Sequence, residues 1–314
     1  MKNIIQLLLL LSLIFSCTGC QKEDNKQQFN IYSLTGPTSM GSVKLYNDDK
    51  DQKYHSHIVS DGSEITSALI NENADIAMLP ANLAAILYNK NPNFKVVAIN
   101  TLGVLYIVEN GNTIQSIDDL HGKTIVLTGQ GTTPEYVLKY LLNSANISDV
   151  DLIFKSSANE VAATLASGLA DIALLPQPFV SVALSKNANL RIALNLSEQW
   201  NKYTDGQQLI TAVTVVRNEI LEKYPEDIKQ FLNSYRESIE WVNQNNADAA
   251  KLIVQANILN DQLIAQNSLP FCNLVYIDGQ EMKYLLENYL KVLYDADPSS
   301  IGMNLPDENF YFYN

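Results

Sequence analysis

A seven-residue motif occurs twice in this chain and constrains the fold more than any other feature. Residues 74–80 read Ala-Asp-Ile-Ala-Met-Leu-Pro, and residues 170–176 read Ala-Asp-Ile-Ala-Leu-Leu-Pro. At the same offset before each copy, a segment with apolar residues at helical spacing begins at Ser63 or at Asn159. Each copy therefore predicts a helix and then a short strand whose proline ends the pairing, because proline has no N–H to donate. The duplication predicts two similar α/β lobes.

An aspartate stands at the entrance of each predicted strand. Asp75 and Asp171 occupy the same position of the repeat. A carboxylate at a strand entrance usually accepts hydrogen bonds from backbone N–H groups. The repeat therefore predicts structural roles for both residues.

A polar turn containing glycine precedes the first helix of each half. The predicted strand Phe29–Leu34 leads into residues 35–41, TGPTSMG, and the predicted strand Thr124–Thr128 leads into residues 129–135, GQGTTPE, before a helix over Tyr136–Leu142. Hydroxyl residues in both turns predict helix N-caps: Thr38 and Ser39 in the first, and Thr132 in a capping box with Glu135 in the second. A helix N-terminus of this kind can receive an anionic or polar group without a charged side chain.

The chain is predicted to cross twice between the two halves. The apolar runs Val96–Asn100 and Leu105–Val108 lead out of the first half, and Leu209–Val216 leads back, before a helix that begins near Pro225. We therefore expect an α/β fold of two lobes, each a mixed sheet flanked by helices, joined by a two-strand hinge. The predicted boundaries place residues 29–103 and 214–314 in lobe 1, and residues 104–213 in lobe 2.

The N-terminus has the pattern of an export signal. Lys2 precedes the apolar run Ile4–Phe15, and residues 1–19 form the predicted signal peptide. The predicted site of lipid attachment is Cys20, with Cys17 as the alternative, and residues 20–28 form a polar tether. The sequence thus predicts an exported protein that a lipid anchors to the extracytoplasmic face of the cell membrane.

Composition disfavours several other functions. The chain has 34 acidic and 21 basic residues, which argues against binding to nucleic acid. Cys272 is the only cysteine beyond the predicted lipidation site, and we expect it in a core rather than in catalysis. The three histidines, His55, His57 and His121, lack acidic or cysteine partners at ligand spacing. We therefore expect no catalytic residue, no metal and no cofactor.

Several segments together resemble one family. They are the cysteine-containing export signal, residues 32–38 (YSLTGPT), the duplicated motif, residues 116–123 (SIDDLHGK), residues 279–282 (GQEM) and residues 300–302 (SIG). They resemble the substrate-binding proteins of ABC importers, in the nitrate, sulfonate and taurine branch. The resemblance implies a type II periplasmic-binding fold that closes on a small solute and delivers it to membrane permease and ATPase subunits, as a monomer without catalytic residues. The alternatives are a ligand sensor acting with a membrane receptor and, less favoured, an enzyme on the same fold.

The expected solute site lies between the lobes, on loops beyond the strands. The predicted loops contain no lysine or arginine, and the nearest, Lys44, lies in the following helix. Helix N-termini alone could hold a sulfonate-like group, and the resemblance implies pyrimidines and aromatic compounds as further candidates, because some members of the family bind them. Tyrosines such as Tyr284, Tyr289 and Tyr294 recur on a C-terminal helix, as core or surface residues do. The predicted ligand-binding residues are Thr38, Ser39, Met40, Ala81, Asn82, Gln130, Thr132, Thr133, Gln177 and Pro178.

Overall fold

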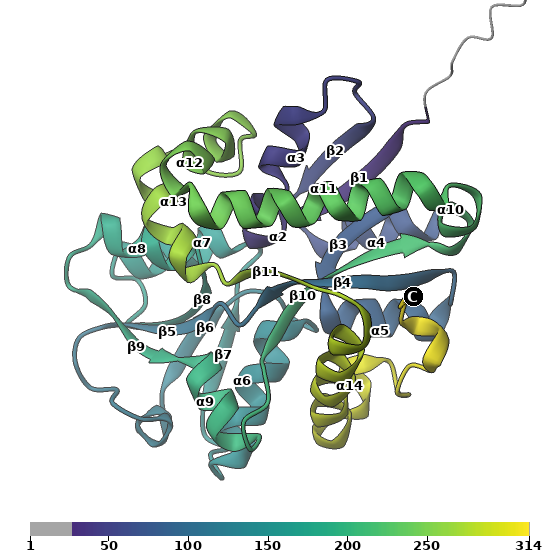
Figure 1. The fold of residues 1–314 in the computed structure, drawn as a ribbon. Helices are drawn as coiled ribbons and strands as arrows, with labels where there is room; N and C mark the ends of the chain where they lie inside the picture. The colour runs from purple at the N-terminus through teal and green to yellow at the C-terminus, as the bar shows by residue number, and fades with distance from the viewer. Residues whose placement is uncertain (1–26, 314) are drawn as a thin grey trace, which may run out of the picture.

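The computed structural model describes residues 27–313 (Figure 1). The predicted signal peptide, Cys17, Cys20 and most of the predicted tether lie outside the described residues. Within residues 27–313, no helix combines the length and the apolar character that a membrane span requires.

The first of two sheets has six strands. Its strands are β1 (Phe29–Leu34), β2 (Tyr54–Val59), β3 (Ile76–Pro80), β4 (Phe94–Leu102), β10 (Ile210–Arg217) and β11 (Leu274–Ile277). Their order across the sheet is β11-β4-β10-β3-β1-β2. The strands β1, β2 and β3 run parallel, and β10 pairs antiparallel with β3 and with β4. This sheet with its helices is called lobe 1 below.

The second sheet has five strands in the order β7-β6-β8-β5-β9. They are β5 (Leu105–Asn110), β6 (Thr124–Leu127), β7 (Asp151–Phe154), β8 (Ile172–Pro176) and β9 (Leu190–Asn195). Again three strands, β6, β7 and β8, run parallel, and β5 pairs antiparallel with β8. This sheet with its helices is called lobe 2, and its likeness to lobe 1 agrees with the sequence repeat.

Helices cover both sheets (Figure 1). Those of lobe 1 are α2 (Pro37–Met40), α3 (Val43–Asp48), α4 (Gly62–Ile70), α5 (Ala81–Lys90), α10 (Asn218–Lys223), α11 (Pro225–Gln244), α12 (Asn246–Gln255), α13 (Gln262–Ser268) and α14 (Gly279–Ala296), with the 3-10 turns Leu269–Phe271, Pro298–Ile301 and Glu308–Phe310. Those of lobe 2 are the 3-10 turn Ile117–Leu120, α6 (Thr133–Ser144), α7 (Ala158–Ala166), α8 (Phe179–Lys186) and α9 (Leu196–Tyr203).

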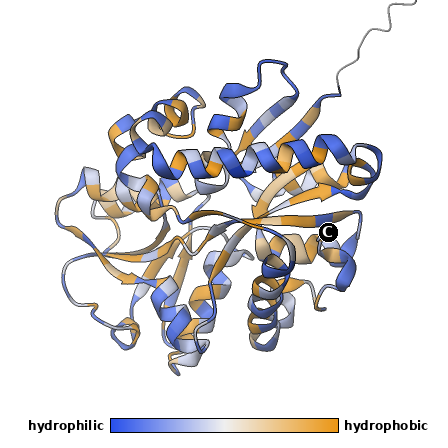
Figure 2. Ribbon diagram, viewed as in Figure 1, coloured by the Kyte–Doolittle hydropathy of each residue, from blue (hydrophilic) through white to orange (hydrophobic). Residues whose placement is uncertain are grey.

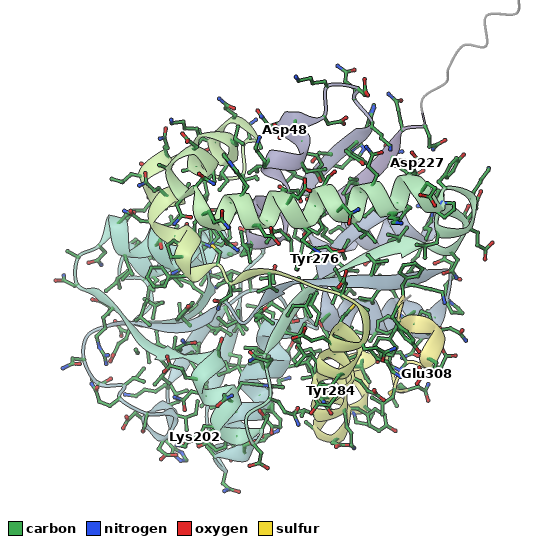
Figure 3. The ribbon with its side chains drawn as sticks, in the orientation of Figure 1. Asp48, Lys202, Asp227, Tyr276, Tyr284 and Glu308 are labelled. Carbon is green, nitrogen blue, oxygen red and sulfur yellow. The ribbon has the colours of Figure 1, made fainter. Side chains whose placement is uncertain are left out.

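The chain crosses between the sheets twice, from β4 to β5 and from α9 to β10. The predicted two-lobed mixed α/β fold is therefore confirmed, while the predicted residue boundaries of the lobes stay predictions. The strands are the most apolar part of the molecule, and the helices turn hydrophilic faces outward (Figure 2). On α14, Tyr289 is buried whereas Tyr284 is 67% exposed and lies on the outer surface (Figure 3).

The paired aspartates differ in their side-chain contacts. Asp75 accepts a hydrogen bond from the Asn30 backbone N–H at 2.8 Å, as predicted, and its other oxygen lies 3.2 Å from the Arg217 guanidinium. Asp171 is exposed, and its side chain makes no hydrogen bond or ion pair within residues 27–313. The predicted structural role of the Asp171 carboxylate is therefore wrong.

The predicted caps also need correction. The helix α2 begins at Pro37 with Gly36 as its N-cap, so Thr38 and Ser39 lie inside the helix. Thr132 is the N-cap of α6, but its hydroxyl donates to the Gly129 carbonyl at 2.7 Å instead of capping the helix. The Glu135 carboxylate accepts from the Gly131 N–H, not from Thr132, so the predicted capping box does not form.

Cys272 is packed in the core, and His57 and His121 each contact another side chain. Cys272 is fully buried, as predicted, and burial raises the pKa of its thiol to about 12. His57 stacks on Tyr32 with ring centroids 4.4 Å apart, and His121 lies 2.8 Å from Asp149. No group of three or more histidine, cysteine or acidic residues within 27–313 could hold a metal ion.

Glu109 is a buried carboxylate on β5. It accepts hydrogen bonds from the backbone N–H and hydroxyl of Thr113, both at 2.6 Å, and its other oxygen lies 2.8 Å from Arg191. Burial opposes its ionisation, but the hydrogen bonds from Thr113 and Ile114 and the charge of Arg191 outweigh burial and hold the pKa of Glu109 below its ordinary value.

This lowered pKa predicts a pH dependence of stability. A carboxylate with a depressed folded-state pKa stabilises the protein above its unfolded-state pKa, and this contribution is lost as pH falls through the folded value. We expect Glu109→Gln to unfold at a lower temperature at pH 7 and to lose less of its melting temperature than the wild type between pH 7 and pH 3. Melting curves across this range test it, with Glu240→Gln on the exposed face of α11 as control. Parallel curves for Glu109→Gln and the wild type would contradict it.

Candidate functional site

A cavity of about 610 Å³ lies between the two lobes. Its walls are the segments that follow the carboxyl ends of six strands: β1, β2 and β3 in lobe 1, and β6, β7 and β8 in lobe 2. Because the three strands of each set are parallel, their carboxyl ends meet at one edge of the sheet, where ligands bind in open α/β folds. The crossing segments close the base with Val104, Leu105, Thr211 and Ala212.

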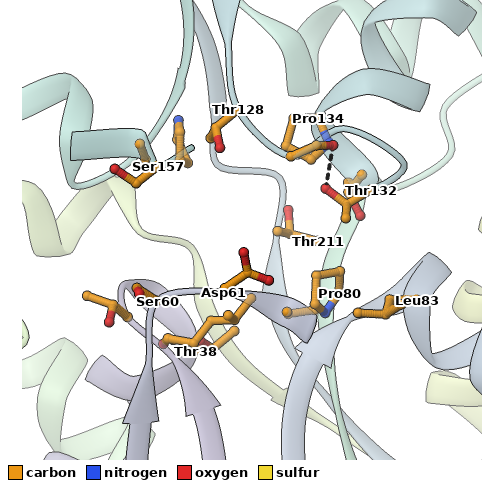
Figure 4. Close-up of a pocket in the computed structure, with 18 of the residues that line it drawn as sticks. Thr38, Ser60, Asp61, Pro80, Leu83, Thr128, Thr132, Pro134, Ser157 and Thr211 are labelled. Carbon is orange, nitrogen blue, oxygen red and sulfur yellow. Dashed lines mark hydrogen bonds between the residues drawn. The ribbon is translucent and has the colours of Figure 1, made fainter. Parts of the chain in front are cut away.

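Four of the ten predicted ligand-binding residues line this cavity: Thr38, Gln130, Thr132 and Thr133. Thr132 lies on the lobe 2 wall facing Pro80 and Leu83 of lobe 1 (Figure 4). The structure thus brings together the two predicted polar turns across the gap. Ligand binding by these residues stays a prediction.

The other six lie outside the lining, and packing explains why. Ser39 hydrogen-bonds within the Gly36 turn, Met40 is buried in the lobe 1 core, and Gln177 accepts from the Ser181 hydroxyl at 2.9 Å. Ala81 and Pro178 are buried at the starts of α5 and α8, behind the strand ends.

Asn82, the sixth, connects the lobes instead of facing the cavity. Its amide donates to the Ser300 carbonyl at 3.1 Å, and its amide oxygen accepts from the Thr133 hydroxyl at 3.1 Å. Asn82 is fully buried, and Thr133 is 1% exposed. The residue therefore positions the N-terminus of α6 against lobe 1.

Two lining segments were missed from the sequence: Ser60–Ser63 after β2 and Lys155–Ala158 after β7. Each precedes a helix and carries its N-cap, Asp61 for α4 and Ser157 for α7. The upstream part of the repeat was the available signal, since both segments precede the helices it predicts. Lys155 also corrects the expectation that no lysine or arginine lies on the binding loops.

The lobe 2 wall is rich in hydrogen-bond donors. Two of its helices, α6 and α7, begin at the cavity, and the first N–H group of each, at the lining residues Thr133 and Ala158, has no hydrogen-bond partner within residues 27–313. Thr128 adds a hydroxyl that points into the gap (Figure 4). Lys155 contributes the only cationic side chain of the described lining. A helix N-terminus attracts negative charge, so this wall suits an anionic group.

The lobe 1 wall has a different character. The hydroxyls of Thr35, Thr38 and Thr66 donate to backbone carbonyls, so their hydrogens are already used. Asp61 is the only carboxylate of the described lining. Its Oδ1 accepts from the Ser63 N–H at 2.7 Å, and this hydrogen bond keeps the pKa of Asp61 below its ordinary value.

A cavity between two hinged α/β lobes, walled by strand ends and helix N-termini, defines a solute-binding protein of the periplasmic type. A sequence model of one family, described as "ABC transporter, phosphonate, periplasmic substrate-binding protein", matches residues 49–260. The chain belongs to this family of ABC-transporter substrate-binding proteins. No curated protein matches the chain.

Solved structures share the fold. A crystal structure of an ABC transporter from Parabacteroides distasonis has 24% identity and a TM-score of 0.77, over 91% of this chain and 98% of that chain. The periplasmic aliphatic sulphonate-binding protein of Escherichia coli has 14% identity and a TM-score of 0.73, over 91% and 92%. The periplasmic nitrate-binding protein of Synechocystis PCC 6803 has 9% identity and a TM-score of 0.62, over 92% of each chain. At these identities the likeness concerns the fold alone.

Family membership settles the broad class. Substrate-binding proteins of ABC importers bind small solutes outside the cytoplasm, work with permease and ATPase subunits, and are not enzymes. The prediction from sequence of a solute-binding protein in the nitrate, sulfonate and taurine branch is thus confirmed as to class and fold.

Proposed function

We propose that this chain is the lipid-anchored solute-binding component of an ABC importer and captures a small organic anion of the sulfonate or phosphonate kind. The observation that carries the proposal is the donor-rich lobe 2 wall, where α6, α7 and Lys155 meet at the cavity. Cys20, or else Cys17, is the proposed lipidation site. The protein acts as a monomer.

The free N–H groups favour an anion over a neutral ring. The amides of Thr133 and Ala158 are fixed by their helices, so an anion can accept from them without any reordering of side chains. Nothing in the lining offers a comparable surface for stacking. Its only aromatic residue among those described is Phe179, which is 6% exposed. We therefore favour the sulfonate-like solute over the pyrimidine and aromatic alternatives.

Capture follows from the two-strand hinge. Residues 29–103 with 214–314, and residues 104–213, are proposed to move as two bodies about the crossing segments. A solute that contacts both walls binds the closed form more tightly and so shifts the population toward it. The closed, loaded form is then the one that the permease receives.

A variant with added negative charge tests the anionic class. Thr128→Asp places a carboxylate beside the N-termini of α6 and α7, and the Thr128 hydroxyl has no hydrogen-bond partner to lose within residues 27–313. The measurement is native mass spectrometry and thermal shift of the form beginning after Cys20, incubated with a pool of small sulfonates and phosphonates. Asn189→Asp, on an exposed turn outside the cavity, makes the same change in net charge and is the control.

We expect the wild type and Asn189→Asp to retain a solute of matching mass. At 100 times the dissociation constant the solute adds about 2.7 kcal/mol to the free energy of unfolding. Thr128→Asp should bind it at least tenfold more weakly, since like charges repel at close range. Equal binding by Thr128→Asp and the wild type would rule out an anion at this wall, and retention of no small molecule would contradict the solute-binding role of this cavity.

A further inference from the structure

The first crossing between the lobes is held by a segment that is far from it in the sequence. Asn273 comes directly before β11, which runs beside β4 at the junction of the two sheets (Figure 1). The Asn273 carbonyl accepts from the Leu102 N–H at 3.1 Å, and the Asn273 side-chain amide donates to the Gly103 carbonyl. Leu102 ends β4, and Gly103 is the next residue of the crossing. Asn273 therefore fastens the crossing to lobe 1 by two hydrogen bonds.

Gly103 also lies tightly against lobe 2. A Cβ added to Gly103 would clash with the side chain of Ser197 in the first turn of α9. The same Cβ would lie 3.0 Å from the Cδ2 of Leu209, which is the last residue of the second crossing before β10. Glycine is required here because it alone permits so close an approach to the backbone. Both crossings and both lobes thus meet at Gly103.

The Ser197 hydroxyl is a donor that has no acceptor in this arrangement. Its oxygen is buried and has no hydrogen-bond partner within residues 27–313. A buried hydroxyl without a partner costs free energy, so an arrangement of the lobes that gives it an acceptor is favoured to that extent. The Gly103 carbonyl is a candidate acceptor, because glycine tolerates backbone angles that other residues avoid and its peptide can turn.

The described arrangement of the lobes is open at the side of the cavity formed by the segments after β2 and β7. These segments, Ser60–Ser63 and Lys155–Ala158, lie on opposite walls, and no hydrogen bond or ion pair joins them within residues 27–313. Ser60 and Ser157 face each other across the gap in Figure 4. The hydrogen bond from Asn273 to Gly103 therefore belongs to an arrangement in which these walls are apart.

We infer that Asn273 and Ser197 are alternative donors to the Gly103 carbonyl, and that their exchange sets the balance between the open and the closed protein. Asn273 on lobe 1 holds the carbonyl in the open form. Rotation of lobe 2 turns the Gly103 peptide toward α9, where the Ser197 hydroxyl becomes its donor. The inference rests on the proposed movement of two bodies and adds the contact that sets its resting population. Both residues are positioning residues, because they act through the crossing and not on the solute.

Two substitutions with opposite expected effects test this exchange. Asn273→Gly removes the side-chain amide of an exposed residue and keeps its left-handed backbone, with φ 43°, which glycine adopts readily. Ser197→Ala removes the other donor. The control is Asn257→Gly, the same change at an exposed asparagine with φ 56° that follows α12 and lies in neither crossing.

The balance is measured without solute, as the distance between two spin labels by pulsed electron paramagnetic resonance. The labels are attached at Glu64→Cys on α4 and Ala163→Cys on α7, two exposed positions on helices that begin at opposite walls of the cavity. In the form that begins after Cys20, the only other thiol is that of Cys272, which is fully buried and does not take a label.

We expect two label distances in the wild type, with the longer one predominant. Asn273→Gly should raise the ratio of the shorter to the longer distance about fivefold, because it removes a hydrogen bond that only the open form makes. Asn273→Asp, which keeps the side-chain shape but replaces the donor with an acceptor, should raise the ratio at least as much. Ser197→Ala should lower the ratio.

A substitution that merely loosened the fold would broaden both distances without favouring one. The inference is overturned if both Asn273 variants match Asn257→Gly, if Asn273→Gly and Ser197→Ala shift the ratio in the same direction, or if every variant shows one unchanged distance. Because no solute is added, these outcomes do not depend on the solute class. The retained-solute experiment above tests the solute-binding role separately.

Discussion

Replacing Asp75 with alanine is expected to lower the free energy of unfolding by about 3–5 kcal/mol. The side chains of Asp75 and Arg217 are 11% and 10% exposed, and their charged atoms lie 3.2 Å apart. Removing the carboxylate leaves a buried guanidinium without its close partner, and the Asn30 N–H loses its acceptor at 2.8 Å. Glu72 and Glu219, at 3.3 and 3.6 Å from Arg217, are both more than half exposed and can compensate only in part.

The repeat supplies the matched control for this prediction. Asp171→Ala changes the same motif position in lobe 2, where the side chain is exposed, and should alter stability by less than about 0.5 kcal/mol. Urea unfolding followed by circular dichroism measures both variants. Equal losses at the two positions, or a loss below about 1 kcal/mol for Asp75→Ala, would show that the buried pair does not stabilise lobe 1.

The second large effect is expected at Trp200, where alanine should cost about 3–5 kcal/mol. Trp200 on α9 is fully buried, with its ring 4.9 Å from Tyr140 on α6 and 5.4 Å from Tyr289 on α14. The helices α6 and α9 belong to lobe 2 and α14 belongs to lobe 1, so this aromatic cluster joins the lobes along one flank. Loss of the Trp200 ring should weaken both the packing within lobe 2 and the contact between the lobes.

Trp241 is the matched control, since the chain has only two tryptophans. It lies partly exposed on α11, with the Lys44 ammonium 5.2 Å from its ring, and Trp241→Ala should cost about 1 kcal/mol. Each variant keeps one tryptophan, so the fluorescence of that tryptophan in urea reports on the unfolding of the lobe that contains it. Trp200→Phe should keep most of the stability, because the indole N–H has no hydrogen-bond partner within residues 27–313. A Trp200→Ala variant no less stable than Trp241→Ala would refute the role of the cluster.

Local patterns in the sequence predicted the elements well. The predicted strand Phe29–Leu34 coincides with β1, and the strand predicted over Leu209–Val216 is β10, one residue later. Such predictions succeed because apolar spacing, glycine and proline act on neighbouring residues. The caps were less predictable, because Thr38 and Thr132 each have several nearby backbone partners, and both hydroxyls bond to carbonyls instead.

The site could be predicted only in part, because local sequence patterns mark some of its loops and not others. The loops after β1 and β6 carry the glycine-rich turns, and these were found. The loops after β2 and β7, with Asp61 and Lys155, lack such a signature and reach the cavity because β2 and β7 pair in parallel with β1 and β6. Buried positions such as Asn82 were misplaced because hydrogen bonds to Ser300 and Thr133 turn the side chain away from the cavity.

The sequence by itself determined that the chain forms two similar α/β lobes, because the duplicated motif and its upstream helix are patterns of adjacent residues. Only the tertiary structure decided how the two copies differ. The N–H of Arg217 donates to the Asp75 carbonyl, and the N–H of Asn110 donates to the Asp171 carbonyl in the same way. Arg217 lies 142 positions from Asp75 in the chain, and only antiparallel pairing of β10 with β3 brings its charge to that carboxylate, whereas Asn110 brings none to Asp171.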